Sequence, residues 1–191
     1  MRIIAITTPA MAVDDVVLIR RLLERGVDIV HLRKPDADAE YCRAVLSALT
    51  VEERSRIVIH DYAELYAEFS LLGIHQNRNI GALPAGYRGL KTRSCHTIEE
   101  VVRYKDECDY LFLSPIFDSI SKEGCLSGFG AEELKRYATE GIIDDRVVAL
   151  GGVTIDKIAY LRSLGFGGVA MVGALYNKDA LATIANFDTY K

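Results

Sequence analysis

Short runs of branched and aromatic apolar residues alternate along this chain with longer stretches whose apolar positions recur at helical spacing. Apolar runs of roughly four to eight residues bounded by turn residues are typical of buried strands. The longer stretches begin at candidate N-capping side chains such as Asp14, Asp15 and Thr154. The pattern predicts strands at residues 2–8, 28–33, 56–61, 72–76, 91–96, 110–117, 146–153 and 168–172.

A helical pattern follows seven of the eight predicted strands, at residues 14–25, 36–49, 62–69, 97–105, 131–139, 154–164 and a last stretch ending near 186. The exception is 77–90, which has three glycines, one proline and no apolar face. Strands that are apolar on both faces and joined by helices form parallel sheets, and eight such units close into a barrel. We therefore predict an α/β fold, a single (β/α)8 TIM-barrel domain over residues 1–191, compact, with the fourth helix reduced or missing.

Composition narrows the classes of partner. The chain has 191 residues, of which 50% are hydrophobic, and a formal net charge of −4. An acidic balance without a basic block disfavours nucleic acid and anionic membranes. No apolar run approaches the ~20 residues that span a bilayer, and the first residues have the pattern of a strand rather than of a signal peptide. The four cysteines lack CxxC spacing, so we expect reduced thiols in a cytoplasmic protein.

Polar side chains gather at the predicted carboxyl ends of the strands, where barrel enzymes hold their active sites. One histidine in such a place is at least as often a satisfied core or surface residue as a functional one. All four histidines of the chain lie at these ends, which favours a functional cluster at one rim. The residues concerned are His31, Arg33, His60, Asp61, His75, Gln76, Ser94, His96 and Ser114.

A metal site built from these histidines is a weaker alternative. Neutral imidazoles together with Asp61 are plausible zinc ligands. The sequence has neither the HxH nor the HExxH spacing that would strengthen that interpretation.

Two segments predict anion binding. Gly151 and Gly152 close the seventh strand, and Val172 and Gly173 close the eighth, where barrels commonly bind phosphate through backbone N–H groups. The second segment places Ser119, Ser121 and Lys122 among glycines, which suits a pyrophosphate, although its residue order is not that of a Walker loop. The alternatives without anion binding are that the first segment only forms tight turns and that the second is a mobile polar loop.

Taken together, these segments resemble the thiamin phosphate synthase family and its sister group, the TenI-type thiazole tautomerases. The resemblance runs nearly end to end and keeps the family's order of motifs. The matching segments are HLRK (31–34), VIHD (58–61), GIH (73–75), SCHTIEE (94–100), YLFLSPIFDSISK (110–122), VVALGGVT (147–154) and GGVAMVGAL (167–175).

The resemblance implies a transferase that joins hydroxymethylpyrimidine pyrophosphate to a thiazole phosphate and releases pyrophosphate. The leaving group would depart first, and the thiazole nitrogen would capture the resulting pyrimidine-methyl cation. The implied pyrophosphate ligands are Arg33, Ser119, Ser121 and Lys122, and Asp61 matches a ligand of Mg2+. Ser94 matches a contact near the pyrimidine pyrophosphate. The thiazole phosphate cradle would comprise Gly152 and Gly173, with Val172 between the strand and the second glycine.

The chain also departs from the family pattern. His31 stands at a position where the family has a glutamine, and we expect it to be part of the substrate site. His60 stands at a position where the family has an asparagine. Pro35 replaces a lysine, with Lys34 one place away. Residues 76–80 contain no carboxylate, whereas the family has a second metal-binding aspartate there. The TenI-type catalytic histidine is absent as well, because its position holds Pro115.

These departures leave alternatives open. In a metal-independent tautomerase of thiazole phosphate, His60 or His96 would move the proton. The chain could instead be a non-catalytic regulatory binder of a thiamin-pathway phosphate, or a more distant phosphate-binding barrel such as a sugar phosphate epimerase. We expect small phosphate or pyrophosphate substrates in each case, and a homodimer is the family's usual assembly.

Overall fold

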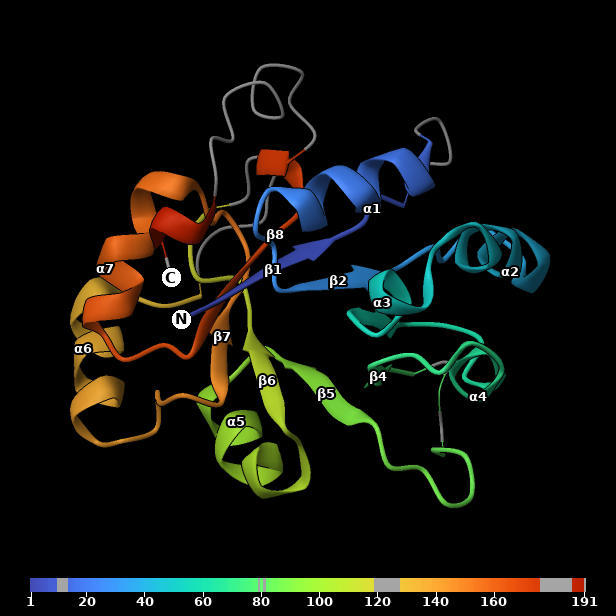
Figure 1. The fold of residues 1–191 in the computed structure, drawn as a ribbon. Coiled ribbons are helices and arrows are strands. Elements are labelled where there is room, and N and C mark those ends of the chain that lie inside the picture. The colour runs from blue at the N-terminus through green and yellow to red at the C-terminus, as the bar shows by residue number, and fades with distance from the viewer. Residues whose placement is uncertain (10–13, 79, 81, 119–127, 176–186, 191) are drawn as a thin grey trace.

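Eight parallel strands form a closed barrel in the computed structural model of the chain, which describes residues 1–9, 14–78, 80, 82–118, 128–175 and 187–190 (Figure 1). Each strand pairs with its neighbours in sequence, and β1 pairs with β8 to close the ring. The strands are β1 (Arg2–Ile6), β2 (Ile29–Leu32), β3 (Ile57–Ile59), β4 (Gly73–Gln76), β5 (Leu90–Cys95), β6 (Tyr110–Leu113), β7 (Val147–Ala149) and β8 (Gly168–Met171). The predicted barrel is confirmed, with most strands shorter than expected.

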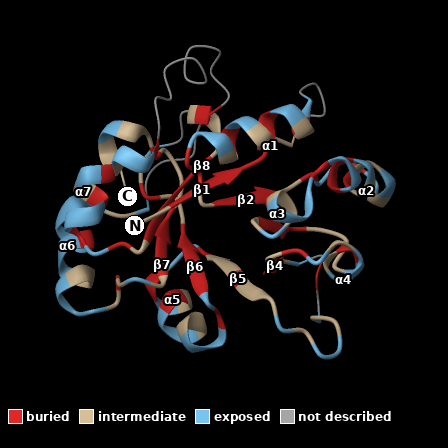
Figure 2. Cartoon of the chain, viewed as in Figure 1, coloured by how far each residue is buried: buried red, intermediate tan, exposed pale blue. Residues whose placement is uncertain are grey.

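Helices surround this barrel, and their outer faces are largely exposed, whereas the strands are mostly buried and β5 is half-buried (Figure 2). The described residues of 77–90, which follow β4, contain no helix. The predicted loss of the helix after the fourth strand is therefore confirmed for that part of the segment. The predicted helix ending near 186 lies largely outside the described residues. The α-helices that the structure describes are α1 (Asp15–Glu24), α2 (Ala39–Ala48), α3 (Val51–Arg54), α4 (Glu64–Phe69), α5 (Ile98–Tyr104), α6 (Ala131–Thr139) and α7 (Ile158–Ser163).

Side-chain caps explain where several helices begin. Asp14 accepts hydrogen bonds from two backbone N–H groups of α1, and Asp38 and Thr97 do the same for one N–H group of α2 and of α5. The short helix α3 was not predicted. It begins with a reciprocal capping box between Thr50 and Glu53, a local signal that the sequence does contain.

The barrel has two apolar cores, one between strands and helices and one inside the ring of strands. Side chains alternate between them along each strand. The inner core is unusual because it also contains fully or nearly fully buried polar residues. The apolar inner residues are Ile4, Ile6, Ile29, Val58, Tyr110, Phe112, Val148 and Ala170.

No helix within the described part of the chain is long and apolar enough to cross a membrane. Three cysteines fall in this part, Cys42, Cys95 and Cys108, and all three are free and buried.

Candidate active site

Three of the four histidines meet inside the barrel, near the carboxyl ends of β2, β3 and β4. His31 is 0% exposed, His60 is 5% exposed and His75 is 3% exposed. The clustering follows the sequence prediction, but these rings lie within the barrel rather than at its rim. The reason is that each of them points inward from its strand and is buried in the interior of the ring of strands.

His31 is held between two partners. Its Nδ1 lies 2.8 Å from Nε2 of His60, and its Nε2 lies 2.6 Å from the hydroxyl oxygen of Tyr110. The rings of His60 and His75 stack with centroids 4.1 Å apart and an interplanar angle of 15°. The three imidazoles therefore form one packed unit.

His75 connects this unit to the predicted substrate contact Ser94. Its Nδ1 lies 2.8 Å from Oγ1 of the buried Thr92, and its Nε2 lies 3.1 Å from Oγ of the half-buried Ser94. Thr92 thus orients the ring, and the ring orients the serine hydroxyl. Sequence reasoning did not include Thr92 or Tyr110 in the site.

The three rings are neutral at ordinary pH. Burial lowers the pKa of His31 and His60 well below its usual value, and the charge of His75 would lower both further. Burial also lowers the pKa of His75 to about 3, helped by the positive charges of Arg33 and Arg93. The inner wall of the site is therefore polar without being positively charged.

Arg33 supplies positive charge close to this wall. Its backbone N–H donates to Oγ1 of Thr7 at 2.8 Å, and the Thr7 hydroxyl donates back to the carbonyl oxygen of Arg33 at 3.0 Å. This clamp fixes the residue at the end of β2. Its side chain is half-buried and makes no ion pair with the residues that the structure describes.

Lys34 does not take the place of the family lysine that Pro35 replaces. Its Nζ lies 2.7 Å from Oδ2 of Asp15, and both side chains are 0% exposed. Nζ also donates to the carbonyl oxygen of Thr8 at 2.8 Å. The ammonium group is therefore used inside the protein, as a bridge between the start of α1 and the end of β2.

Asp61, the predicted metal ligand, follows His60 directly and is half-buried. Within the described residues, the group of three or more potential metal-ligating side chains is the histidine unit, and Asp61 is not part of it. Asn77, in the segment without carboxylates, uses its amide locally. It donates to the carbonyl oxygen of His60 and accepts from the N–H of Ile80.

The predicted phosphate cradle lies at the ends of β7 and β8. Gly152 has φ +61°, and a Cβ there would lie 2.3 Å from the carbonyl oxygen of Asp118, so the backbone path requires glycine. Lys157, in the 3-10 helix Ile155–Lys157, donates from Nζ to the carbonyl oxygen of Gly152 at 2.9 Å. Val172 is half-buried, and Gly173 begins the 3-10 helix Gly173–Leu175. Sequence reasoning missed Lys157.

His96 lies apart from the histidine unit. It is exposed, and its Nδ1 donates to the carbonyl oxygen of Ser114 at 2.8 Å. The predicted pyrophosphate ligands Ser119, Ser121 and Lys122 lie outside the described residues. Their roles, like those of the other site residues, stay predictions.

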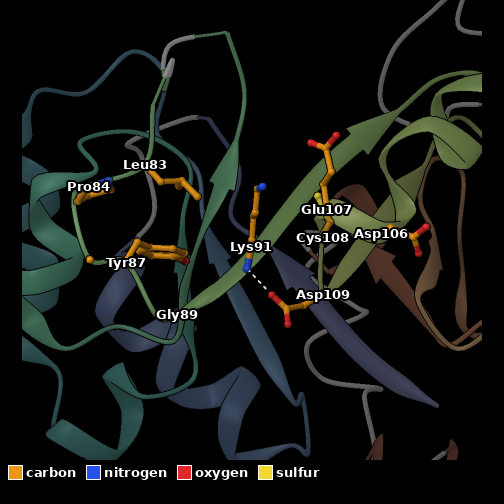
Figure 3. A pocket seen from close by; sticks show the side chains of 10 residues that line it. Leu83, Pro84, Tyr87, Gly89, Lys91, Asp106, Glu107, Cys108 and Asp109 are labelled. Carbon is orange, nitrogen blue, oxygen red and sulfur yellow. Dashed lines mark hydrogen bonds between the residues drawn. The ribbon is translucent and has the colours of Figure 1, made fainter.

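A groove of about 530 Å³ lies at the opposite, amino-terminal end of the strands (Figure 3). It runs between the segment that leads into β5 and the residues just before β6. Figure 3 shows Lys91 beside Asp109, whose carboxylate accepts from the Lys91 backbone N–H at 2.7 Å. The groove is therefore separated from the histidine unit by the packed interior of the barrel.

Comparison with known proteins shows to which family this barrel belongs. A family model described as thiamine monophosphate synthase matches residues 3–175. The chain belongs to this family. A thiamine-phosphate synthase of Serratia proteamaculans is 32% identical over 174 residues, which cover 85% of this chain and 81% of the relative. The corresponding synthase of Klebsiella pneumoniae is 29% identical over the same shares of both chains.

Solved structures of the thiamine monophosphate synthase family agree with the fold. The crystal structure of thiamine phosphate pyrophosphorylase from Bacteroides thetaiotaomicron is 36% identical, with a TM-score of 0.85 over 100% of this chain and 95% of its own. The corresponding protein of Pyrococcus furiosus is 18% identical, with a TM-score of 0.77 over 99% and 94%. The second likeness supports the fold alone. The family predicted from the sequence motifs is therefore confirmed.

Proposed function

We propose that this chain is a thiamin-phosphate synthase, which joins hydroxymethylpyrimidine pyrophosphate to thiazole phosphate and releases pyrophosphate. The observation that carries the proposal is the end-to-end match to the Bacteroides thetaiotaomicron pyrophosphorylase, at 36% identity and a TM-score of 0.85. The match covers 100% of this chain, so it spans the strand ends where barrel chemistry takes place.

The geometry supports a reaction in which charge separates. Negative charge grows on the departing pyrophosphate, and the guanidinium of Arg33 stands at the end of β2 to stabilise it. Positive charge grows on the pyrimidine-methyl carbon, and the neutral imidazoles of His31, His60 and His75 do not repel it. Lys122, Ser119 and Ser121 are assigned to the same pyrophosphate on the family resemblance.

Mg2+ fits this site only together with substrate. Asp61 offers one carboxylate, and residues 76–80 offer none. Magnesium commonly binds through one or two protein carboxylates, with phosphate oxygens and waters completing an octahedron. When bound, the ion would neutralise the charge of the pyrophosphate. Asp61 would hold the ion, and we expect little affinity for Mg2+ without the pyrophosphate substrate.

The second substrate, thiazole phosphate, fits the carboxyl end of the barrel at β7 and β8. We assign the thiazole phosphate to backbone N–H groups near Gly152 and Gly173, with Val172 against the thiazole ring. Ser94, oriented by His75, would contact the pyrimidine substrate from the opposite side. In this assignment the two substrates approach each other from opposite sides of one barrel end, so that the nucleophile and the cation meet.

The deciding experiment supplies both substrates with Mg2+ and measures pyrophosphate release. Release that requires both substrates supports the synthase. A folded protein that releases none under these conditions contradicts it. Proton exchange on the thiazole carboxylate tautomer without Mg2+ would instead favour a tautomerase, in which His60 or His96 moves the proton. The lone carboxylate at Asp61 is the observation that keeps this second function in view.

Asp61→Asn tests the metal role within the same assay. The variant should lower pyrophosphate release by about a hundredfold or more, because the charge that holds the ion is lost. Asp106→Asn is the matched control, since that carboxylate is 92% exposed and pairs with Arg146. Unchanged activity in Asp61→Asn would remove the role that we assign to this carboxylate.

A further inference from the structure

The interior of a TIM barrel is usually filled with branched apolar side chains. Here three adjacent strands, β2, β3 and β4, each bring one imidazole to the same place. One ring nitrogen from each of His31, His60 and His75 can be chosen so that all three atoms lie within 4.8 Å of one another. Such convergence of buried nitrogen donors is a feature of transition-metal sites.

We propose that His31, His60 and His75 bind one divalent transition-metal ion of the zinc class, at a site separate from the magnesium site at Asp61. Imidazole nitrogen suits zinc, cobalt, nickel and copper, whereas magnesium prefers oxygen. The proposal concerns the protein without its substrates, because a dication at the three rings would repel the pyrimidine-methyl cation of the proposed reaction.

The pair formed by His31 and His60 shows how the ion enters. Their facing nitrogens are 2.8 Å apart and share one proton, which moves to the other nitrogen of its own ring when both facing nitrogens bind the metal. Zinc–nitrogen bonds of about 2.0–2.1 Å at a tetrahedral angle place two ligand nitrogens about 3.3 Å apart. The two rings must therefore separate by roughly half an ångström.

His75 completes the set by a modest rearrangement. Its Nε2 exchanges the hydroxyl of Ser94, now at 3.1 Å, for the metal. Because the rings of His60 and His75 are nearly parallel, at 15°, one of them tilts so that the two lone pairs converge.

Two of the three remaining ring nitrogens, those of His31 and His75, are already arranged as metal-bound histidines require. If His31 binds through Nδ1, its Nε2–H donates to the Tyr110 hydroxyl, 2.6 Å away. If His75 binds through Nε2, its Nδ1–H donates to Oγ1 of Thr92, 2.8 Å away. Such outer partners fix the tautomer and the ring direction of a metal ligand.

The test is a titration of the untagged protein with Co2+ and then with Zn2+. We expect one equivalent of Co2+ per chain, with the visible absorption of a tetrahedral site, and its displacement by one equivalent of Zn2+. Excess Mg2+ should not compete. His75→Asn should weaken Co2+ binding at least about tenfold, and Tyr110→Phe should weaken it about 10–100-fold by removing an outer partner. His96→Asn, which alters a histidine outside the unit, should leave binding unchanged.

A second measurement on the wild-type protein guards against variants that fail to fold. The imidazole 15N resonances of His31, His60 and His75 should shift when Zn2+ is added, while those of His96 should not. The proposal is overturned if the wild-type protein binds no Co2+ or Zn2+, if only His96 responds, or if binding survives unchanged in folded His75→Asn.

Discussion

At the scale of single residues, the histidine unit shows how surroundings set chemical character. A histidine in water is the side chain that changes charge near neutral pH. Inside this barrel the same ring loses its hydration, and His31 and His75 stay neutral because the charged form cannot be solvated there. Their polar atoms are satisfied by Tyr110, Thr92 and Ser94 instead of by water. These rings therefore contribute hydrogen bonds and ligand atoms rather than charge.

This neutrality predicts that stability falls as pH falls. Unfolded histidines take up protons as pH drops through about 6.5, while the buried rings resist protonation, so the unfolded chain binds more protons. Each ring then lowers the free energy of unfolding by at most about 1.4 kcal/mol per pH unit, starting below pH ~6.5. Guanidinium denaturation at pH about 7 and about 5.5 should show a loss approaching 4 kcal/mol for the three rings. An unfolding free energy that stays constant between these pH values would contradict the neutral buried state.

At the scale of elements, a buried ion pair joins α1 to β2. Asp15 begins the helix and Lys34 follows the strand, and Tyr41 of α2 donates its hydroxyl to the same carboxylate at 2.6 Å. The other carboxylate oxygen, Oδ1 of Asp15, is buried and has no hydrogen-bond partner among the residues that the structure describes. A carboxylate in this position is stabilised mainly by the ammonium group beside it.

Removing that ammonium group should therefore be costly. Lys34→Met should lower the free energy of unfolding by about 3–5 kcal/mol, because it leaves a buried charge without its counter-ion. Lys135→Met provides the matched comparison, since Lys135 pairs with Glu132 at an exposed position and should matter little. Chemical denaturation of the two variants measures the difference. Equal stability would show that the Asp15–Lys34 pair is not maintained in solution.

The end of β7 depends on the close approach of two chain segments. Gly152→Ala places a methyl group against the Asp118 carbonyl oxygen at a positive φ, whereas a Cβ at Gly141, also at positive φ, meets nothing within 4 Å. Gly141→Ala should thus cost about 1 kcal/mol from backbone strain alone, and Gly152→Ala should cost more. Gly152→Ala should also raise the KM for thiazole phosphate by roughly tenfold or more, because the cradle is displaced. If Gly152→Ala and Gly141→Ala have the same KM for thiazole phosphate, Gly152 has no role in binding this substrate.

At the scale of the whole molecule, closure of the barrel divides the protein into two ends. The histidine unit lies at the carboxyl end of the strands, together with those predicted substrate residues that the structure describes. The groove lined by Lys91, Glu107 and Asp109 lies at the amino end (Figure 3). In TIM barrels the carboxyl end carries catalysis, and the amino end serves stability.

This division predicts opposite outcomes for changes of charge at the two ends. Glu107→Gln should leave kcat/KM for both substrates within about twofold, because the groove takes no part in the reaction. Arg33→Gln should lower kcat/KM about a hundredfold, because it removes the positive charge that the proposed function assigns to the pyrophosphate. Steady-state kinetics with each substrate varied in turn decides the matter. A large loss in Glu107→Gln would place a functional site in the groove.

Much of this organisation was predictable from the sequence because its signals are local. The alternation of apolar runs and amphipathic stretches predicted all eight strands, and the glycines of 77–90 predicted the missing helix. The helix α3 was missed although Thr50 and Glu53 form a capping box, because the segment has no apolar face of its own. The role of Lys34 was not predictable, since its partner Asp15 lies on another element.

The sequence by itself determined the barrel, the family and the strand ends at which the polar residues lie. These features follow from periodicity and from motifs of adjacent residues. Only the tertiary structure decided that His31, His60 and His75 are buried in contact rather than spread along a rim. Whether a side chain at a strand end points inward or outward depends on strand register and on closure of the ring. The same packing decided that these histidines are neutral, because burial and neighbouring charges set their pKa values.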